Sequence, residues 1–234
     1  MMKRYSIAGL TVDMELFGRT EKQAEAYRID KEGSADLTLR GDIRKLLETD
    51  SNADPDTALY ILSGAKFARS LLRFDGTFLH ASAVVLNGKA YLFSAYSGTG
   101  KSTHTEKWCR LFGAHYLNDD KPVLRLVDGV WMAYGTPWSG KNDLSTPEGV
   151  PLGGIAFLKR GEANHIRPLM PIEGLPLLMA QSLLKLEKEQ MQTQLTLVDN
   201  LLRSVPLWEL ICRNDDEAAQ IAYAAMTGGT KECE

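Results

Sequence analysis

The sequence has few cysteines and no metal-ligand motif built from them. Cys109, Cys212 and Cys233 are far apart in the chain, odd in number and without the spacing of metal ligands. This pattern argues against a cysteine-bound metal and indicates a reducing cytoplasm.

Long apolar runs and clusters of positive charge are also missing. No apolar stretch approaches the length that crosses a membrane, and Met1 to Arg4 lead into a mixed polar sequence instead of the apolar region of a signal peptide. The formal net charge of −3 and the lack of a Lys/Arg run argue against a nucleic-acid surface. We therefore expect a soluble, cytoplasmic protein with neither a membrane nor a nucleic acid as partner.

The 234 residues suffice for one large domain, or for one domain with a small appendage. Tyr5 to Phe17 and Ala35 to Leu39 alternate like exposed strands, with a polar stretch between them. We therefore predict a β-rich N-terminal appendage over residues 1–50 and a main domain over residues 51–234.

Strands and helices alternate through the main domain, which is typical of an α/β fold or a mixed α+β sandwich. A first helix is predicted from Pro55 to Leu72, after Asp54 as its cap. Further along the chain we predict a strand over Ile155–Leu158, helices over Leu175–Glu189 and Leu195–Leu202, and a strand over Leu207–Cys212. A last helix is predicted to begin with a capping box at Asn214 and Glu217 and to end near Gly228.

A phosphate-binding loop is the strongest motif in the chain, at Ala95-Tyr-Ser-Gly-Thr-Gly-Lys-Ser102. Glycines at 98 and 100 let backbone N–H groups turn toward phosphate oxygens, Lys101 adds positive charge, and Ser102 offers a hydroxyl to Mg²⁺. Ala95 stands where the first glycine is usual. The predicted nucleotide-binding residues are Ala95, Tyr96, Ser97, Gly98, Thr99, Gly100, Lys101, Ser102 and Thr103.

The surroundings of this motif favour a nucleotide site over a glycine-rich turn that happens to precede a lysine. Ala90–Phe93 is typical of a buried strand, and Ser102–Phe112 of a helix that stops at Gly113. Gly135–Asn142 nearly repeats the spacing, but Pro137 interrupts it and no amphipathic helix follows. We expect one nucleotide loop in this sequence.

Two hairpin turns relate this loop to other polar residues. If Asn87-Gly88 is a two-residue turn between Phe78–Leu86 and Lys89–Ser94, the pairing places His80 opposite Ala95. The same arithmetic on Asp128-Gly129 sets Asp120 against Pro137 and Asp119 against Trp138, so that Trp138 and Lys141 would lie near the acidic pair.

Asp119 and Asp120 follow a predicted strand over Ala114–Asn118. Beside a phosphate site, one carboxylate can hold Mg²⁺ while the other accepts a proton from an attacking hydroxyl. A solvated turn is the alternative. His80 can orient a carboxylate or contact the metal, or it can be a half-buried structural histidine.

Other polar residues carry weaker expectations. We expect His104 on the surface, and Lys107 and Arg110 facing solvent on the same helix. Trp138 and Lys141 are candidates for the acceptor pocket, with a capped loop held by an aromatic anchor as the alternative.

Three motifs in this order resemble a known family. They are His80-Ala-Ser-Ala with the Asn87-Gly88 turn, Ser97-Gly-Thr-Gly-Lys-Ser102, and Leu117-Asn-Asp-Asp120. Together they are similar to the catalytic core of HPr serine kinase/phosphorylase and the wider HPr-kinase-like set, which is related to the nucleotide site of ATP-dependent phosphoenolpyruvate carboxykinase. The resemblance covers about residues 74 to 160.

The resemblance implies a mixed α/β sheet with a core of the phosphoenolpyruvate-carboxykinase type and a kinase domain over residues 51–234. Lys101 would bind the transferred phosphate, Ser102 and Asp120 would serve Mg²⁺, Asp119 would be the base, and His80 would interact with the acidic pair. The family's separate N-terminal domain and its Glu-x-Arg-Gly stretch have no counterpart in this sequence. The resemblance therefore does not extend to HPr as substrate or to the reverse reaction.

The sequence predicts an ATP- and Mg²⁺-dependent kinase acting on a hydroxyl of a peptide, protein or small molecule, a ribosomally made peptide among them. The alternatives are a nucleotide-binding regulatory module without turnover and a small-molecule phosphotransferase. A homo-oligomer is left open.

Overall fold

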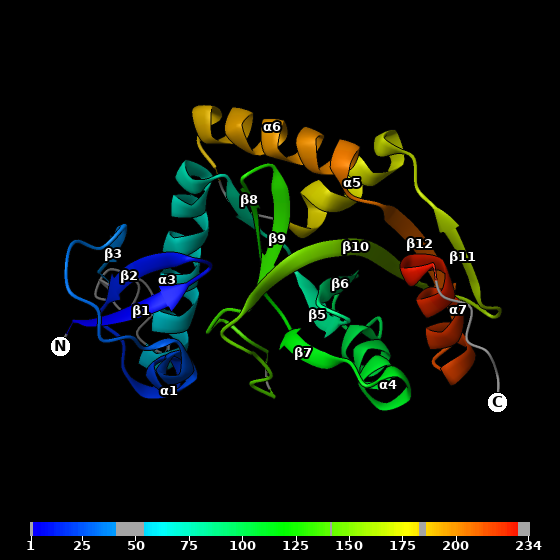
Figure 1. Cartoon of the computed structure of the whole chain (residues 1–234), viewed down its shortest axis with the longest axis horizontal. Helices are drawn as coiled ribbons and strands as arrows, with labels where there is room; N and C mark the ends of the chain where they lie inside the picture. Colours follow the sequence, from blue (N-terminus) through cyan, green and yellow to red (C-terminus); the bar gives the residue numbers. More distant parts are fainter. Residues whose placement is uncertain (1, 41–53, 141, 183–185, 229–234) are drawn as a thin grey trace.

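The computed structural model describes residues 2–40, 54–140, 142–182 and 186–228 (Figure 1). In chain order its elements are β1 (Lys3–Ile7), β2 (Leu10–Met14), α1 (Gly18–Ala24), η1 (Glu25–Tyr27), β3 (Leu37–Leu39), α3 (Pro55–Leu71), η2 (Leu72–Phe74), β4 (Gly76–Phe78), β5 (Ala81–Leu86), β6 (Lys89–Ser94), α4 (Lys101–Phe112), β7 (His115–Asn118), β8 (Val123–Val127), β9 (Val130–Tyr134), β10 (Gly149–Arg160), β11 (His165–Pro168), α5 (Pro171–Gln181), α6 (Lys188–Ser204), β12 (Leu207–Cys212) and α7 (Asp216–Thr227).

A nine-stranded mixed sheet forms the centre of the protein, and this confirms the predicted α/β class with a mixed sheet. Its strands follow the order β4-β8-β9-β10-β6-β5-β7, and β12 pairs with β10 and β11. The long strand β10 joins the two halves. Its first residues, Gly149–Pro151, pair antiparallel with β9, and the rest pairs parallel with β6 and β12.

Helices cover both faces of this sheet (Figure 1). Successive side chains of a strand point to opposite faces, and β5 shows the result. Ala83 and Val85 pack in the cluster that includes α5 and α6, whereas Val84 and Leu86 pack with α4 and α7. Each face of β5 is thus buried under a helical layer, which explains its continuous apolar sequence.

The N-terminal segment forms a three-stranded sheet, β1-β2-β3, where a small β unit was predicted. Ser6 of β1 and Thr38 of β3 are exposed, but the apolar residues that alternate with them are buried. Tyr5 and Ile7 have no exposed surface and belong to one apolar cluster with Phe67 of α3 and with Val123 of the main sheet. The polar stretch between the strands forms α1 and η1. These side chains are buried because α3 covers the sheet. The proposed domain boundary near residue 50 lies outside the described residues.

Both predicted hairpin registers are confirmed within the ladders, which end at Ala81–Ser94 and Val123–Tyr134, before the predicted pairs His80–Ala95, Asp120–Pro137 and Asp119–Trp138. In the first hairpin Leu86 pairs with Lys89 and Ala81 with Ser94, and in the second Val127 pairs with Val130. The predicted strand over Phe78–Leu86, however, divides into β4 and β5. Its backbone turns away at His80, whose N–H donates to the carbonyl of Gln181 at the end of α5, at 2.9 Å.

The C-terminal part differs from the prediction at several boundaries. The helix predicted over Leu175–Glu189 ends with α5 at Gln181, and α6 contains the segment predicted as Leu195–Leu202. The short edge strand β11 was not predicted. Asp215, and not Asn214, caps α7, because its carboxylate accepts the Ala218 N–H at 3.0 Å. The Asn214 side chain accepts from Lys107 instead.

Trp138 anchors the loop after β9 in the core under α3. Its ring has no exposed surface and stacks on Phe67 with 4.9 Å between centroids. Its Nε1–H donates to Ser63 Oγ at 3.1 Å. Gly64 makes this close approach feasible, because a Cβ there would lie 2.9 Å from the indole Cδ1.

We predict that Trp138→Ala lowers the free energy of unfolding by about 3–5 kcal/mol, because it leaves a cavity beneath α3. Urea unfolding followed by circular dichroism measures this change. Ile172→Ala is the control, since Ile172 is 73 % exposed on α5, and it should change stability by less than about 0.5 kcal/mol. Equal effects of the two substitutions would contradict the anchoring role of Trp138.

Candidate functional site

The phosphate-loop motif forms a turn between the end of β6 and the start of α4. Gly98 and Gly100 have φ angles of 78° and 118°, in the region that favours glycine. An added Cβ would meet no heavy atom within 4 Å at either position. The backbone conformation, and not lack of space, therefore requires glycine at both positions.

The start of α4 faces the same loop, with Lys101 and Ser102 as its first residues. The first N–H groups of a helix have no partner within it and attract anions. The Lys101 side chain is buried, and its Nζ donates to the Ala95 carbonyl at 2.8 Å. Burial lowers the pKa of this amine, whereas nearby Asp120 raises it. An anion bound by the loop would place a second negative charge near this ammonium group, in addition to that of Asp120, and would stabilise its charged form.

A pocket of about 610 Å³ opens at this loop, within the size range of ligand sites. Phosphate-loop residues form one wall, and the acidic pair forms another. The lining residues are Arg19, Tyr60, His80, Ser97, Gly98, Gly100, Lys101, Ser102, Thr103, Asp119, Asp120, Ser139, Gly140 and Asn142. The protein thus brings together side chains that are more than a hundred residues apart in sequence.

Asp119 is a buried carboxylate at the edge of this pocket, only 7 % exposed. Its Oδ1 accepts the backbone N–H of Gly140, and its own N–H donates to the Leu144 carbonyl at 3.0 Å. Burial raises the pKa of this carboxyl, the Gly140 N–H lowers it, and Asp120 raises it further. A fixed carboxylate with a raised pKa is suited to accept a proton.

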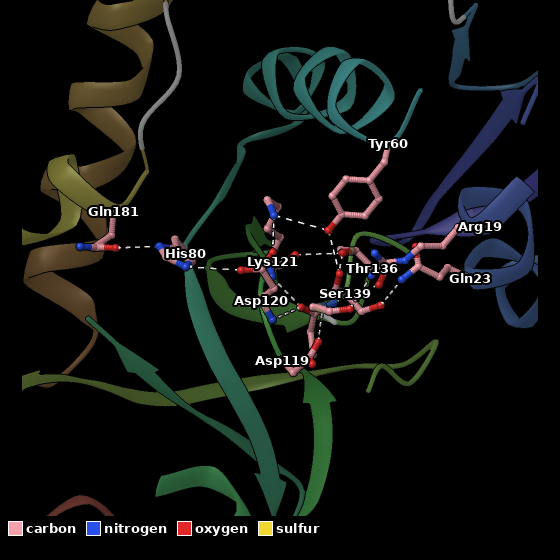
Figure 2. A network of polar contacts seen from close by, with 12 residues as sticks. Arg19, Gln23, Tyr60, His80, Asp119, Asp120, Lys121, Thr136, Ser139 and Gln181 are labelled. Carbon is pink, nitrogen blue, oxygen red and sulfur yellow. Dashed lines mark hydrogen bonds and ion pairs between the residues drawn. The ribbon is translucent and has the colours of Figure 1, made fainter. Parts of the chain in front are cut away.

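Asp120 lies between two basic side chains (Figure 2). Its Oδ2 forms an ion pair with Lys121 Nζ, and its Oδ1 lies 3.4 Å from His80 Nε2. The backbone N–H of Asp120 donates to Asn118 Oδ1 at 2.9 Å, which holds the turn after β7. Asp119 and Asp120 therefore point into the same pocket with different partners.

His80 connects the acidic pair to the end of α5 (Figure 2). Its Nδ1 lies 3.2 Å from Gln181 Oε1, so that Nδ1–H donates to the amide oxygen. The titrating proton is then the one on Nε2, beside Asp120. Burial lowers the pKa of His80, Lys101 lowers it further, and Asp120 raises it.

Several residues of this pocket were not predicted. Arg19 of α1 donates from Nη2 to the Gly140 carbonyl at 2.7 Å, and its guanidinium lies 5.5 Å from the Tyr60 ring. Tyr60 of α3 donates its hydroxyl proton to the Ser139 carbonyl at 2.7 Å. No local motif marks these residues, because their role depends on the packing of α1 and α3 against the loop after β9.

The outcomes for three single residues differ. His104, expected on the surface, is 4 % exposed and packs on Phe93 with 4.5 Å between ring centroids. Burial lowers its pKa to about 3. Trp138 has no exposed surface, as the aromatic-anchor alternative requires. Lys141 lies outside the described residues.

The predicted Mg²⁺ donors, Ser102 and Asp120, line one pocket. Within the described part of the chain, no group of three or more His, Cys, Asp or Glu side chains could hold a metal by itself. Mg²⁺ is commonly bound by one or two protein oxygens together with substrate phosphates and water. One hydroxyl and one carboxylate therefore fit an ion that arrives with a nucleotide.

Comparison with known proteins gives a weak structural likeness. No family model and no curated protein matches the chain. The solved structures include a similar one, the Hpr(Ser) kinase/phosphatase from Coxiella burnetii, at 10 % identity and a TM-score of 0.39 over 65 % of this chain and 95 % of that chain. A score of this size carries no conclusion on activity.

Among the helices that the structure describes, none has the length and apolarity to span a membrane.

We predict that His80 titrates below its ordinary value of 6.5, and that two substitutions move its pKa in opposite directions. Asp120→Asn should lower the pKa, because the carboxylate stabilises the imidazolium, and Lys101→Met should raise it. Histidine NMR titration measures both shifts. His104 is the internal reference, since it should stay neutral down to about pH 3.

The same shift has a consequence for stability. The pKa of His80 is lower in the folded state than in the unfolded state, so the folded protein binds the proton less tightly. The free energy of unfolding should therefore decrease as the pH falls from 6.5 through the lowered pKa of His80. A wild-type pKa at or above 6.5, or shifts of one sign in both variants, would contradict this description of the site.

Proposed function

We propose that the protein is an ATP- and Mg²⁺-dependent kinase that transfers the γ-phosphate to a hydroxyl, most suitably a serine or threonine of a peptide or protein. One observation carries the proposal. The phosphate loop, with Lys101 and Ser102, and the buried carboxylate of Asp119 line the same pocket. Phosphoryl transfer needs positive charge on the phosphates and a group that accepts the hydroxyl proton.

In this proposal the loop and Lys101 bind the phosphates. The N–H groups at the start of α4 and the glycine-rich backbone would face the phosphate oxygens, and the Lys101 ammonium would lie beside the transferred group. Ser102 and Asp120 would hold Mg²⁺, which would neutralise phosphate charge when it is bound. Lys121 balances the charge of Asp120 and also donates to the Tyr60 hydroxyl, 3.5 Å from its Nζ.

Asp119 is proposed as the base that takes the proton of the acceptor hydroxyl. Its Oδ1 is held by the Gly140 N–H, which fixes the direction of the carboxylate. Burial raises the pKa of this carboxyl and so increases its basicity. His80 would hold Asp120 in place through Nε2 and is supported on its other side by Gln181.

The nucleoside would leave the loop on the side away from Asp119, because attacking and leaving oxygens lie roughly in line in phosphoryl transfer. Strand order supports this direction, since β7 and β12 lie on opposite sides of β6. A cavity of about 380 Å³ lies on the β12 side, bordered by Gly98, Arg160, Arg213 and Asn214. Arg160 Nη2 reaches the Gly98 carbonyl at 2.5 Å.

We predict that Asp119→Asn lowers phosphoryl transfer by about 100-fold or more, because the amide cannot accept the proton. ATP affinity should change little, since Asp119 lies on the acceptor side of the loop. Lys101→Met should instead weaken ATP binding. Radiolabelled ATP with a panel of serine and threonine peptides measures transfer, and calorimetry measures ATP binding.

Asp128→Asn is the matched control. Asp128 is an exposed residue of the β8–β9 turn, with a φ of 49° that asparagine also adopts readily. It should leave transfer and ATP binding unchanged. Full transfer by Asp119→Asn would exclude Asp119 as the base. ATP binding without transfer to any acceptor would instead support a nucleotide-binding module.

A further inference from the structure

A second cavity, of about 400 Å³, adjoins the candidate active pocket. The two share Tyr60, His80 and Ser97 as walls. The second cavity continues from there between α3 and the end of α5, with Ala65 of α3 and Ala180 of α5 among its lining residues. A ligand that fills it therefore reaches the residues around Asp119 and Asp120.

Apolar groups form most of this second cavity. Its apolar lining comes from Ile61, Gly64, Ala65 and Ala68 of α3, from Phe78 of β4 and from Ala180 of α5. No carboxylate is among its described lining residues, and the charge of its one lining lysine, Lys121, is paired with Asp120. Lys121 Nζ lies 5.3 Å from the centre of the Tyr60 ring. The cavity suits an uncharged, bulky apolar group.

Two large apolar side chains at the mouth of the cavity are exposed to solvent. Ile61 of α3 is 57 % exposed, and Tyr96 of the phosphate loop is 73 % exposed. Exposed apolar residues that continue an apolar cavity mark binding sites more often than isolated ones do. They extend the apolar surface beyond the cavity, as contact with a longer chain requires.

We propose that this second cavity binds a large apolar side chain of the acceptor peptide, next to the serine or threonine whose hydroxyl faces Asp119. The proposal rests on the kinase function proposed above and specifies its substrate. Tyr60, His80 and Ser97 line both cavities. Successive residues of an extended peptide advance by about 3.3–3.6 Å, so a residue close to the serine in the peptide can enter the second cavity while the serine hydroxyl faces Asp119.

The test compares serine peptides that differ only in the residues flanking serine, with leucine, phenylalanine, alanine or aspartate there. Burial of a leucine or phenylalanine side chain should favour those peptides by about ten-fold or more over alanine, in binding and in transfer. Binding is measured by calorimetry without ATP, and transfer with radiolabelled ATP. No preference for the large apolar residues in either measurement would overturn the proposal.

Two variants test the location of the preference. Ala65→Leu fills the cavity with a residue of similar helix propensity, and should reduce the preference to near unity while ATP affinity is kept. Ile61→Ser removes the exposed rim without disturbing the core and should weaken binding of the apolar peptides alone. Ala225→Leu, on an exposed position of α7 far from the site, is the matched control and should have neither effect.

The two proposals can fail separately. If apolar peptides bind preferentially and Ala65→Leu removes the preference, but no peptide is phosphorylated, the cavity assignment holds and the kinase function is wrong. If peptides are phosphorylated without regard to flanking residues, the kinase function holds and the cavity assignment is wrong. A preference that survives both Ala65→Leu and Ile61→Ser would also overturn the assignment.

Discussion

The antiparallel pairing of β5 with β6 is the constraint on which the site depends. The two-residue turn at Asn87-Gly88 sets Ala81 opposite Ser94, so the residues that follow β6 and precede β5 are held side by side. Ser94 Oγ then donates to the His80 carbonyl at 2.8 Å. The phosphate loop and His80 are therefore positioned by one ladder, in which a slip of one residue would turn every side chain to the opposite face.

A second constraint orients the acidic pair. Asn118, which has no exposed surface, accepts the N–H groups of Asp120 and Lys121 through Oδ1 and donates from Nδ2 to the Thr136 carbonyl. One amide side chain thus joins the turn after β7 to the loop after β9. The same loop supplies the Gly140 N–H to Asp119. Asp120 is thus oriented through Asn118, and Asp119 through the loop that Asn118 holds.

The N-terminal segment contacts the loop beside the acidic pair. Gln23 of α1 donates to Ser139 Oγ at 3.0 Å, and Arg19 reaches the Gly140 carbonyl. Tyr60 of α3 holds the same loop at Ser139. The apolar cluster between α3 and β1-β2-β3 also buries Trp138, the anchor of that loop. Packing of the N-terminal unit and the geometry around Asp119 are therefore linked.

Local patterns in the sequence determined the elements whose causes are local. The phosphate loop required glycine at positions 98 and 100, the Asn87-Gly88 and Asp128-Gly129 turns set two registers, and Asp54 and Gly113 marked helix ends. Only the tertiary structure decided the rest. Burial of His104 and of β1 and β2, the break at His80, and the arrival of Arg19 and Tyr60 at the pocket depend on contacts between segments that are distant in sequence. Periodicity describes which face of a segment is apolar, but it cannot say which partner covers that face.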